Sequence, residues 1–504
     1  MAGPYNASTT AAELVDHFAE KIKDKVILTT GPSPASIGAT FLKTVARAHP
    51  ALLILAGRST SKLQQTADAI TEENPSVSIH LLQLELDSLS AVRAAAAKVN
   101  SWNDVPRIDV LVNNAGIMAT DFALSPDGYE GQFATNHLGH FLFTNLIIEK
   151  ILASPSPRVV NVSSDGHRLS PIRWADTNFR EGETYNRWSA YGQSKTANML
   201  MAISLAEKLG AKGLLAYSLH PGIIKGTGLT GGVPFEEILP GLIAADRSLG
   251  NEQGWRKAPS LKTSQQGAAT TVYAAFDPSL QEFSGKYLCD CHVADPWIDT
   301  LRPWGTDKVE AERLWKLNDT AHFQSIPWVT ALLRDPTFTT IPTPSRVFKS
   351  STEDSFFSTT ISSPTTIAAC VTQYRTPPPN AQPIRPKAIP TNEIRIFVTL
   401  GSDLNGYPGV LHGGMVATLL DEFMGLILSL RLGGGVEGQD GPVTAFLNTK
   451  FVRPVLTPGT VVVNSRITEE KEMRKWKIEG DIRDEEGTKM ALGASSRPIQ
   501  CRDA

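Results

Sequence analysis

The sequence has little cysteine, four residues in 504. So few cysteines exclude a disulfide framework and indicate a reducing compartment, so we expect a cytoplasmic protein. Basic residues are not in excess, with 48 Lys and Arg against 51 Asp and Glu, which argues against a nucleic-acid partner. No apolar run approaches the roughly 18 residues of a membrane helix, and the N-terminus lacks a basic-then-apolar leader. We therefore expect neither a membrane span nor a secretory signal.

Glycine and proline are at ordinary levels, 39 and 33 residues, which excludes collagen-like and low-complexity chains. Hydrophobic residues make up 41% and charged residues 20%, as in most globular proteins. At about 150 residues per domain, the length predicts two to four domains.

Between residues 20 and 318, short apolar runs alternate with amphipathic, helix-like stretches. Five of the runs are strand-like: Lys25–Thr30, Leu52–Ala56, Ser78–Leu84, Ile108–Val112 and Arg158–Val162. Continuous apolar strands separated by helices are typical of a parallel sheet covered on both faces. With right-handed crossovers, this pattern predicts an α/β doubly wound, Rossmann-type domain over residues 20–318.

The pattern changes after about residue 320. Residues 322–395 are interpreted as an extension or linker, in which the Ser-, Thr- and Pro-rich segment Thr337–Pro390 is predicted to be an irregular connection. From Glu393, a strand is followed by a long apolar helix and then by three alternating strands: helix Gly414–Leu432, strands Val443–Phe451, Thr460–Ile467 and Lys475–Asp484. One helix followed by antiparallel strands predicts an α+β domain over residues 396–502.

The segment Thr30–Gly38 lies between the first strand and the first helix of the predicted sheet. Backbone N–H groups and a helix N-terminus at this place can hold a pyrophosphate, and we assign Gly31, Ile37 and Gly38 to a dinucleotide. A strand-to-helix turn that needs small residues is the alternative.

The second strand ends in Arg58, with no acid where a ribose diol would be bound. An arginine there suits a 2′-phosphate, so we expect NADP(H) rather than NAD. Lys62 is a second candidate for this phosphate, although a solvated helix lysine is the alternative. Asp87 and Asn114 follow the third and fourth strands, which places them at the same edge of the sheet.

Tyr191 and Lys195 stand at positions i and i+4 and so share one face of a helix. A tyrosine near its free pKa of about 10 is a poor proton donor and acceptor at neutral pH. The Lys195 ammonium and a nicotinamide charge are expected to lower the pKa of Tyr191 and make it a general acid/base.

Taken together, these motifs resemble the short-chain dehydrogenase/reductase family, in its retinol-dehydrogenase-like branch. The matching segments are Thr30-Gly31…Gly38, Asn113-Asn114-Ala115-Gly116, Asn136–Phe141, Val162-Ser163-Ser164, Tyr191…Lys195 and His220-Pro221-Gly222. The resemblance implies that Tyr191 donates a proton in reduction and that Ser164 hydrogen-bonds the substrate oxygen. It also implies that Lys195 holds the nicotinamide ribose and that Asn136 positions a relay water.

The chain departs from the family pattern at two places. Ala35 and Ser36 stand where the glycine motif usually has Gly. After His220-Pro221-Gly222, the expected threonine comes later than usual, at Thr227. The resemblance implies that Ile224 and Thr227 contact the cofactor.

A second motif, His412-Gly413-Gly414, opens the apolar helix, and Asp421 follows nine residues after the histidine. Gly414 leaves a backbone N–H unobstructed, able to polarise a carbonyl oxygen. A carboxylate in an apolar helix is costly unless it is paired or functional, although Asp421 beside Glu422 is alternatively a surface acid. His412 is interpreted more readily as a turn or packing histidine than as a general acid/base.

Residues 400–500 resemble the hotdog-fold thioesterases of the phenylacetyl-CoA thioesterase type. The resemblance implies that the Gly414 N–H binds the thioester oxygen and that Asp421 is a nucleophile or general base. Sites of this type form between two subunits, so it also implies a homo-oligomer, a dimer or higher. The pair Cys289 and Cys291 is too closely spaced to hold zinc, Cys370 and Cys501 are distant, and we assign no metal.

The sequence thus predicts an NADPH-dependent carbonyl reductase or alcohol dehydrogenase with a C-terminal acyl-thioesterase domain. Its expected substrates are a small-molecule carbonyl or alcohol and an acyl-CoA or acyl-carrier thioester, in lipid or polyketide-type secondary-metabolite biosynthesis. One alternative is an acyl-CoA thioesterase with a non-catalytic reductase-like scaffold. Another is a reductase dimerised by a non-catalytic hotdog module.

Overall fold

The computed structural model divides the chain into two compact units, Met1–Asn318 and Asp319–Ala504. It describes residues 4–224, 226–230, 233–256, 260–346, 354–383, 385, 388–433, 443–471 and 475–498. Cys501 and the predicted domain end at residue 502 lie outside these residues. Among the helices of the described part, none is long and apolar enough to cross a membrane.

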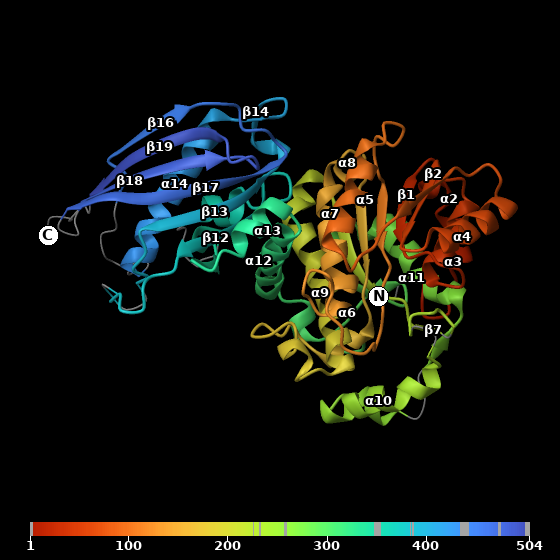
Figure 1. Cartoon of the computed structure of the whole chain (residues 1–504). Coiled ribbons are helices and arrows are strands. Elements are labelled where there is room, and N and C mark those ends of the chain that lie inside the picture. Colours follow the sequence, from red (N-terminus) through yellow and green to blue (C-terminus); the bar gives the residue numbers. More distant parts are fainter. Residues whose placement is uncertain are drawn as a thin grey trace. The chain divides into compact units, whose positions relative to one another are not determined.

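The first unit is built on an eight-stranded sheet (Figure 1) in the order β10-β9-β6-β5-β4-β1-β2-β3. The strands are β1 Val26–Thr30, β2 Leu52–Gly57, β3 Ile79–Gln83, β4 Val110–Asn113, β5 Arg158–Val162, β6 Leu215–His220, β9 Tyr287–Cys289 and β10 His292–Val293. All neighbours are parallel except β9 and β10. The order 3-2-1-4-5-6 confirms the predicted doubly wound, Rossmann-type sheet.

Helices cover both faces of this sheet because its central strands are apolar on both sides. One face packs on α1 Ala11–His17, α3 Ile37–Ala46, α4 Thr60–Glu73 and α11 Ser264–Phe276. The other lies against α5 Leu89–Ser101, α7 Gly139–Leu146 and α9 Arg187–Leu209. In β1 the alternation is visible, since Ile27 belongs to the first core while its fully buried neighbour Leu28 points to the opposite face.

Shorter elements complete the first unit. They are α2 Ala19–Ile22, α6 Gly131–Phe133, the π-helical turn Ala134–Leu138, α8 Ile148–Leu152, β7 Ile223–Ile224, α10 Phe235–Ser248 and β8 Leu261–Lys262. Helix α12, Lys308–Gln324, includes the boundary between the units.

The second unit contains a seven-stranded antiparallel sheet in the order β11-β12-β13-β17-β18-β19-β16. Its elements are α13 Pro327–Leu333, β11 Phe338–Pro342, β12 Ile367–Arg375, β13 Glu393–Leu400, β14 Asn405–Tyr407, β15 Val410–Leu411, α14 Gly413–Leu432, β16 Phe446–Phe451, β17 Gly459–Lys471, β18 Lys475–Arg483 and β19 Lys489–Pro498. In β13, Ile396 and Val398 share a core with α14, whereas Phe397 packs with Phe323 and Val329 on the other face. One apolar helix on an antiparallel sheet confirms the predicted α+β hotdog domain.

The predicted irregular connection Thr337–Pro390 is wrong in part, because β11 and β12 lie within it as sheet strands. The sequence of β12 mixes Ala, Cys, Thr and Gln, and nearly all of these side chains are buried. Small and polar residues therefore hide the alternation that identifies a strand. Strand β19, rich in Ala, Gly and Ser, was missed after the three predicted strands for the same reason.

Candidate active sites

A cavity of about 770 Å³ opens at the C-terminal edge of the parallel sheet in the first unit. It brings together most of the residues predicted to bind cofactor or substrate: Gly31, Ile37, Arg58, Lys62, Asp87, Asn114, Ser164, Tyr191, Lys195, Ile224 and Thr227. Gly38 and Asn136 are not part of its lining. A Cβ on Gly38 would lie 2.6 Å from Asn114 Nδ2, so this glycine allows α3 to approach the end of β4.

The loop between β1 and α3 depends on two residues in left-handed backbone conformations. Gly31 has φ +68°, and a Cβ there would lie 2.8 Å from Ala115. Ala35, where the family usually has Gly, adopts φ +63°. Ser36 caps α3, since its Oγ accepts a hydrogen bond from Ala39 N at 3.1 Å. Ser36 and Ile37 line the cavity, so the positive end of the α3 dipole faces it.

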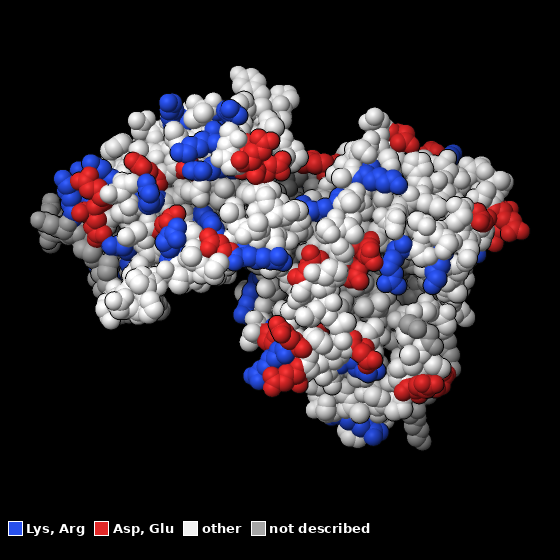
Figure 2. Space-filling model, viewed as in Figure 1, with Lys and Arg blue, Asp and Glu red and all other residues white. Residues whose placement is uncertain are grey.

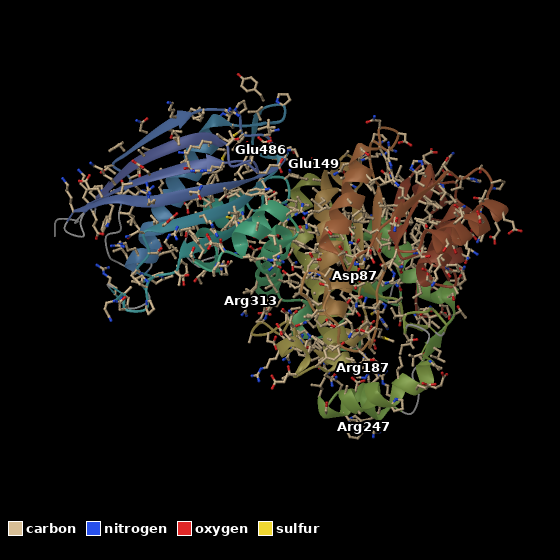
Figure 3. The ribbon with its side chains drawn as sticks, viewed as in Figure 1. Asp87, Glu149, Arg187, Arg247, Arg313 and Glu486 are labelled. Atoms are coloured by element: carbon tan, nitrogen blue, oxygen red, sulfur yellow. The ribbon has the colours of Figure 1, made fainter. Side chains whose placement is uncertain are left out.

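Charged side chains border the same end of the cavity. Arg58 and Lys62 are exposed and follow β2, where Ser59 caps α4 by accepting a hydrogen bond from Lys62 N. Asp87, labelled in Figure 3, follows β3 and is half-buried. Two cations beside a helix N-terminus make this end of the cavity suited to an anion.

Tyr191 and Lys195 lie side by side on α9, which is buried along most of its length. The Ser164 hydroxyl hydrogen-bonds the Tyr191 side chain. Lys195 Nζ lies 5.6 Å from the centroid of the Tyr191 ring and donates to Val162 O at 3.1 Å. Ser163 instead donates to Lys195 O at 2.7 Å, so Ser164 is the serine that faces the tyrosine.

The predicted lowering of the Tyr191 pKa is wrong for this structure. Burial raises the pKa of Tyr191 to about 12, and the Ser164 hydrogen bond offsets this rise in part. Burial also lowers the pKa of Lys195 to about 8. Both shifts have one physical cause, because removal from water disfavours the charged form of each group.

Asn136 lies in the π-helical turn, behind the cavity. Its Oδ1 accepts from Ile117 N at 2.8 Å, and its Nδ2 donates to Ile117 O and Ser194 Oγ, each at 2.9 Å. A Cβ on Gly116 would lie 3.1 Å from Asn136 Oδ1 and 3.4 Å from Lys195 Nζ. The asparagine and the lysine therefore flank the same glycine of the loop after β4.

The sequence reasoning missed an ion-pair network beside the Ser164 end of the cavity. Arg168 Nη2 lies 2.7 Å from Asp246 Oδ2, and Arg168 Nη1 lies 2.7 Å from Asp165 Oδ2. The side chains of Arg168 and Asp246 are almost fully buried. The Arg168–Asp246 pair links α10 to the turn after Ser164. Beside this link, Trp188 and Leu242 form an apolar wall of the cavity. No local motif marks the contact between Arg168 and Asp246, because these two residues are 78 positions apart in the sequence.

In the second unit, Asp421 lies in α14 and is paired rather than free. Its Oδ1 is 2.5 Å from Arg497 Nη2, an arginine of β19, and accepts from Thr444 Oγ1 at 2.9 Å. The Asp421 side chain is 42% exposed and the Arg497 side chain 8%. A Cβ on Gly425 would lie 2.7 Å from Arg497 Nη1, so this glycine gives the guanidinium room beside the helix.

The predicted unobstructed N–H of Gly414 has an acceptor in the structure. His412 caps α14, and its Nδ1 accepts the Gly414 N–H at 2.9 Å. The histidine is exposed, as are Gly413 and Gly414. A hollow of about 1060 Å³ in this unit is lined by residues of the sheet, of α13 and of the turn after β18, and includes neither Gly414 nor Asp421.

Within the described residues, one cluster has the donor types of a metal site. His292 Nε2 lies 2.9 Å from Asp299 Oδ2 and 3.6 Å from Cys289 Sγ. From the sequence, Cys289 was considered only together with the other cysteines, and not with His292 or Asp299. Asp299 Oδ2 also accepts from Asp295 N at 2.8 Å, so the group is hydrogen-bonded internally.

Comparison with known proteins finds a family match in each unit. Residues 25–176 match the family model of short chain dehydrogenases, and residues 408–491 match that of the thioesterase superfamily. The short-chain dehydrogenase/reductase prx1 of Penicillium rubens is 37% identical over 328 residues, which cover 63% of this chain and 91% of that protein.

Two further relatives are also named as dehydrogenases. The chloroplastic short-chain dehydrogenase TIC 32 A of Brassica napus is 35% identical, over 61% of this chain and 91% of its own. Retinol dehydrogenase 12 of Mus musculus is 31% identical, over 59% of this chain and 86% of its own. The chain therefore belongs to the short-chain dehydrogenase/reductase family of oxidoreductases, whose members bind a nicotinamide cofactor, and it also carries a thioesterase-superfamily hotdog domain.

Proposed function

We propose that the first unit is an NADPH-dependent carbonyl reductase, which also runs as an alcohol dehydrogenase in reverse. The observation that carries this proposal is the cluster of Ser164, Tyr191 and Lys195 on one wall of a cavity with cations at its other end. The cavity thus has a place for an anion and a place for proton transfer.

The residues present fit NADP(H). The α3 N-terminus and the loop at Gly31 offer N–H groups to a pyrophosphate. Arg58 and Lys62 offer charge to a 2′-phosphate, and no acid follows β2 to bind a ribose diol. When bound, the cofactor supplies or accepts the hydride.

The side chains of this unit perform the proton chemistry. Ser164 donates a hydrogen bond to the carbonyl oxygen of the substrate and so holds it beside Tyr191. The Tyr191 hydroxyl gives its proton to that oxygen as negative charge develops there, which produces the alcohol. Lys195 binds the ribose of the cofactor, and Asn136 orders the backbone around a relay water. The apolar wall at Trp188 favours an apolar substrate body.

The test is Tyr191→Phe. Removing the proton donor should lower the kcat of NADPH-dependent reduction of an aromatic aldehyde by about 10²–10⁴-fold. The dissociation constant of NADPH, measured by fluorescence, should stay within threefold of the parent. Reduction at the parent rate would refute the assignment and leave the first unit as a scaffold.

We propose thioester hydrolysis as the activity of the second unit, and Asp421 is the observation that favours it. Its Oδ1 is fixed by Arg497 and Thr444, and the side chain remains partly exposed. In this proposal Asp421 attacks an acyl-CoA or acyl-carrier thioester or activates water, and the Gly414 N–H passes from His412 to the thioester oxygen.

We infer a homodimer or higher oligomer through the edge of the second sheet. Among the described strands, β16 ends the sheet and pairs only with β19, and its Phe446 and Phe451 are 54% and 58% exposed. An edge strand with large apolar side chains is a template for pairing with another copy. Sedimentation of the full chain should show the oligomer, and Phe451→Lys should weaken it.

We place both reactions in lipid or polyketide-type biosynthesis, because ketone reduction and thioester cleavage are neighbouring steps there. In this proposal the substrates are small molecules, and the mixed positive and negative charges on the surface are consistent with that. Figure 2 shows Lys and Arg interspersed with Asp and Glu over the visible surface of each unit, as expected for a net charge of −3. A metabolite profile of a deletion strain tests this placement.

A further inference from the structure

His140 is a buried histidine of α7, 1% exposed, and no step proposed above uses it. Both of its ring nitrogens have partners. Nδ1 lies 3.0 Å from the backbone carbonyl oxygen of Asn136, and Nε2 lies 2.8 Å from Thr30 Oγ1. The ring therefore connects the end of β1 to the π-helical turn that carries Asn136.

The two partners determine which nitrogen of His140 carries the proton. A backbone carbonyl accepts hydrogen bonds and cannot donate them, so Nδ1 must be the protonated nitrogen. In a neutral ring, Nε2 is then an acceptor, and the Thr30 hydroxyl must donate to it.

The surroundings of Thr30 lead to the same assignment independently. Thr30 Oγ1 accepts from Asn114 N at 2.9 Å and from Ala115 N at 3.0 Å. These two bonds use both lone pairs of the hydroxyl oxygen, so its hydrogen is left to donate. Two acceptors lie within reach of it, and His140 Nε2 at 2.8 Å is much closer than Val112 O at 3.5 Å. The resulting chain runs from the N–H groups of the loop after β4, through Thr30 and His140, to the carbonyl of Asn136.

The charge on His140 agrees with this chain of donors and acceptors. Burial is the main cause that lowers its pKa to about 4; the hydrogen bond to the Asn136 carbonyl opposes this shift and the nearby Lys195 ammonium adds to it, so the ring is neutral at physiological pH. His137, in the π-helical turn that precedes α7, is also buried, and burial lowers its pKa to about 3. A charged His140 would direct a third donor at Thr30 Oγ1 and break one of the loop bonds.

We propose that His140 is a positioning residue for the reductase, which fixes the Asn136 peptide relative to the cofactor loop by acting as a neutral, Nδ1-protonated bridge. This inference rests on the proposed reductase function. The Asn136 side chain binds Ser194, the neighbour of Lys195, so the bridge orients one side of the proton-relay group. Small displacements at such a place lower turnover strongly, by up to about 10²-fold per ångström.

Three variants of the full chain test the proposal. His140→Leu keeps apolar volume and removes both hydrogen bonds. His140→Gln restores one acceptor and one donor, spaced much as in the ring. Phe143→Leu is the matched control, because Phe143 is fully buried in the same helix and takes no part in the bridge. For each variant we would measure kcat, KM for an aromatic aldehyde, the NADPH dissociation constant and the melting temperature.

We expect His140→Leu to lower kcat at least tenfold while the NADPH dissociation constant changes less than threefold. His140→Gln should recover kcat to within threefold of the parent. Phe143→Leu should lower the melting temperature and leave kcat unchanged. If His140→Leu and Phe143→Leu lose stability alike and both keep the parent kcat, His140 is a packing residue and the inference is wrong.

A second measurement, which does not depend on enzyme activity, tests the proposal if His140→Leu does not fold. In protein labelled with ¹⁵N-histidine, long-range ¹H–¹⁵N spectra distinguish Nδ1–H from Nε2–H rings, and His140→Gln identifies the signals of His140. The Nδ1–H form should be present from pH 6 to 8, and an Nε2–H ring would overturn the proposal. Failure of the reductase function itself is separate, since it would show as Tyr191→Phe reducing carbonyls at the parent rate.

Discussion

Substitution of Asp421 by Asn is the perturbation that best separates the two proposed activities. The amide keeps the size of the side chain and an oxygen that accepts hydrogen bonds from Arg497 and Thr444. It loses the charge that attacks the thioester or deprotonates water. We therefore expect thioester hydrolysis to fall by about 10²–10⁴-fold, the usual contribution of a general base.

The effect of Asp421→Asn on stability follows from the ion pair. Removing one partner of a fully buried pair costs about 3–5 kcal/mol, whereas an exposed pair contributes about 0–1 kcal/mol. Here the arginine is buried, but the aspartate side chain is 42% exposed, so solvent screens the pair. We estimate a loss of about 1–2 kcal/mol, which lowers the melting temperature of a domain of this size by about 2–8 °C.

Two matched variants isolate the chemistry from this loss of stability. Glu422→Gln removes the neighbouring acid of the same helix, whose pKa burial raises, and should leave hydrolysis unchanged. Arg497→Gln breaks the same ion pair but keeps the charge of Asp421. It should lower the melting temperature as Asp421→Asn does and retain more than a tenth of the hydrolysis rate. The assays are release of free thiol from acyl-CoA and NADPH oxidation with an aldehyde.

Two results would refute this reasoning. Hydrolysis that survives Asp421→Asn at the parent rate would make Asp421 a structural partner of Arg497. Equal loss of reduction at unchanged melting temperature would mean that the two sites are coupled, because the proposed catalytic and cofactor-binding residues of the reductase all precede residue 230.

Three further predictions concern the first unit and the division of the chain. Arg58→Asp should shift the ratio of kcat/KM for NADPH over NADH by at least tenfold toward NADH, and an unchanged ratio would assign the 2′-phosphate to another residue. Because burial lowers the Lys195 pKa to about 8, kcat/KM for reduction should fall as pH rises through 8 and the ammonium is lost, and Lys195→Arg should remove that decline. Residues 1–318 and 319–504, expressed separately, should each unfold cooperatively, and loss of cooperativity in either would contradict two independent cores.

Much of the first unit could be predicted from the sequence because each of its signals is local. The run Arg158–Val162 is strand β5 without a change of boundary, and the other four predicted strands differ by one or two residues at one or both ends. Buried parallel strands are continuously apolar, so they stand out against the helices between them. In the second unit, the apolar helix α14 was placed to within one residue, while β12 and β19 lacked that contrast.

The residues of the candidate sites were found where a short motif carries them, and were missed where distant segments meet. Tyr191 and Lys195 share a helix turn, and the structure brings both to the cavity. Arg497, in a strand 76 residues further along the chain, forms an ion pair with Asp421, and no sequence motif near either residue predicts this contact. His140 belongs to the matching segment Asn136–Phe141, so the sequence marks its position. Its hydrogen bond to Thr30 joins residues 110 positions apart, and it forms only when α7 packs against the sheet.

The Tyr191 pKa shows how burial reverses an argument made from charge alone. From the sequence, the lysine one helical turn away was expected to lower that pKa. In the folded unit both side chains are buried, and the loss of hydration favours the neutral form of each. At neutral pH the tyrosine of the free enzyme therefore holds its proton, as donation to a carbonyl oxygen requires. Oxidation of an alcohol needs the tyrosinate instead, which a pKa of about 12 disfavours. Burial of Tyr191 thus keeps its phenol protonated in the unliganded site, which is the form that the proposed carbonyl reduction uses.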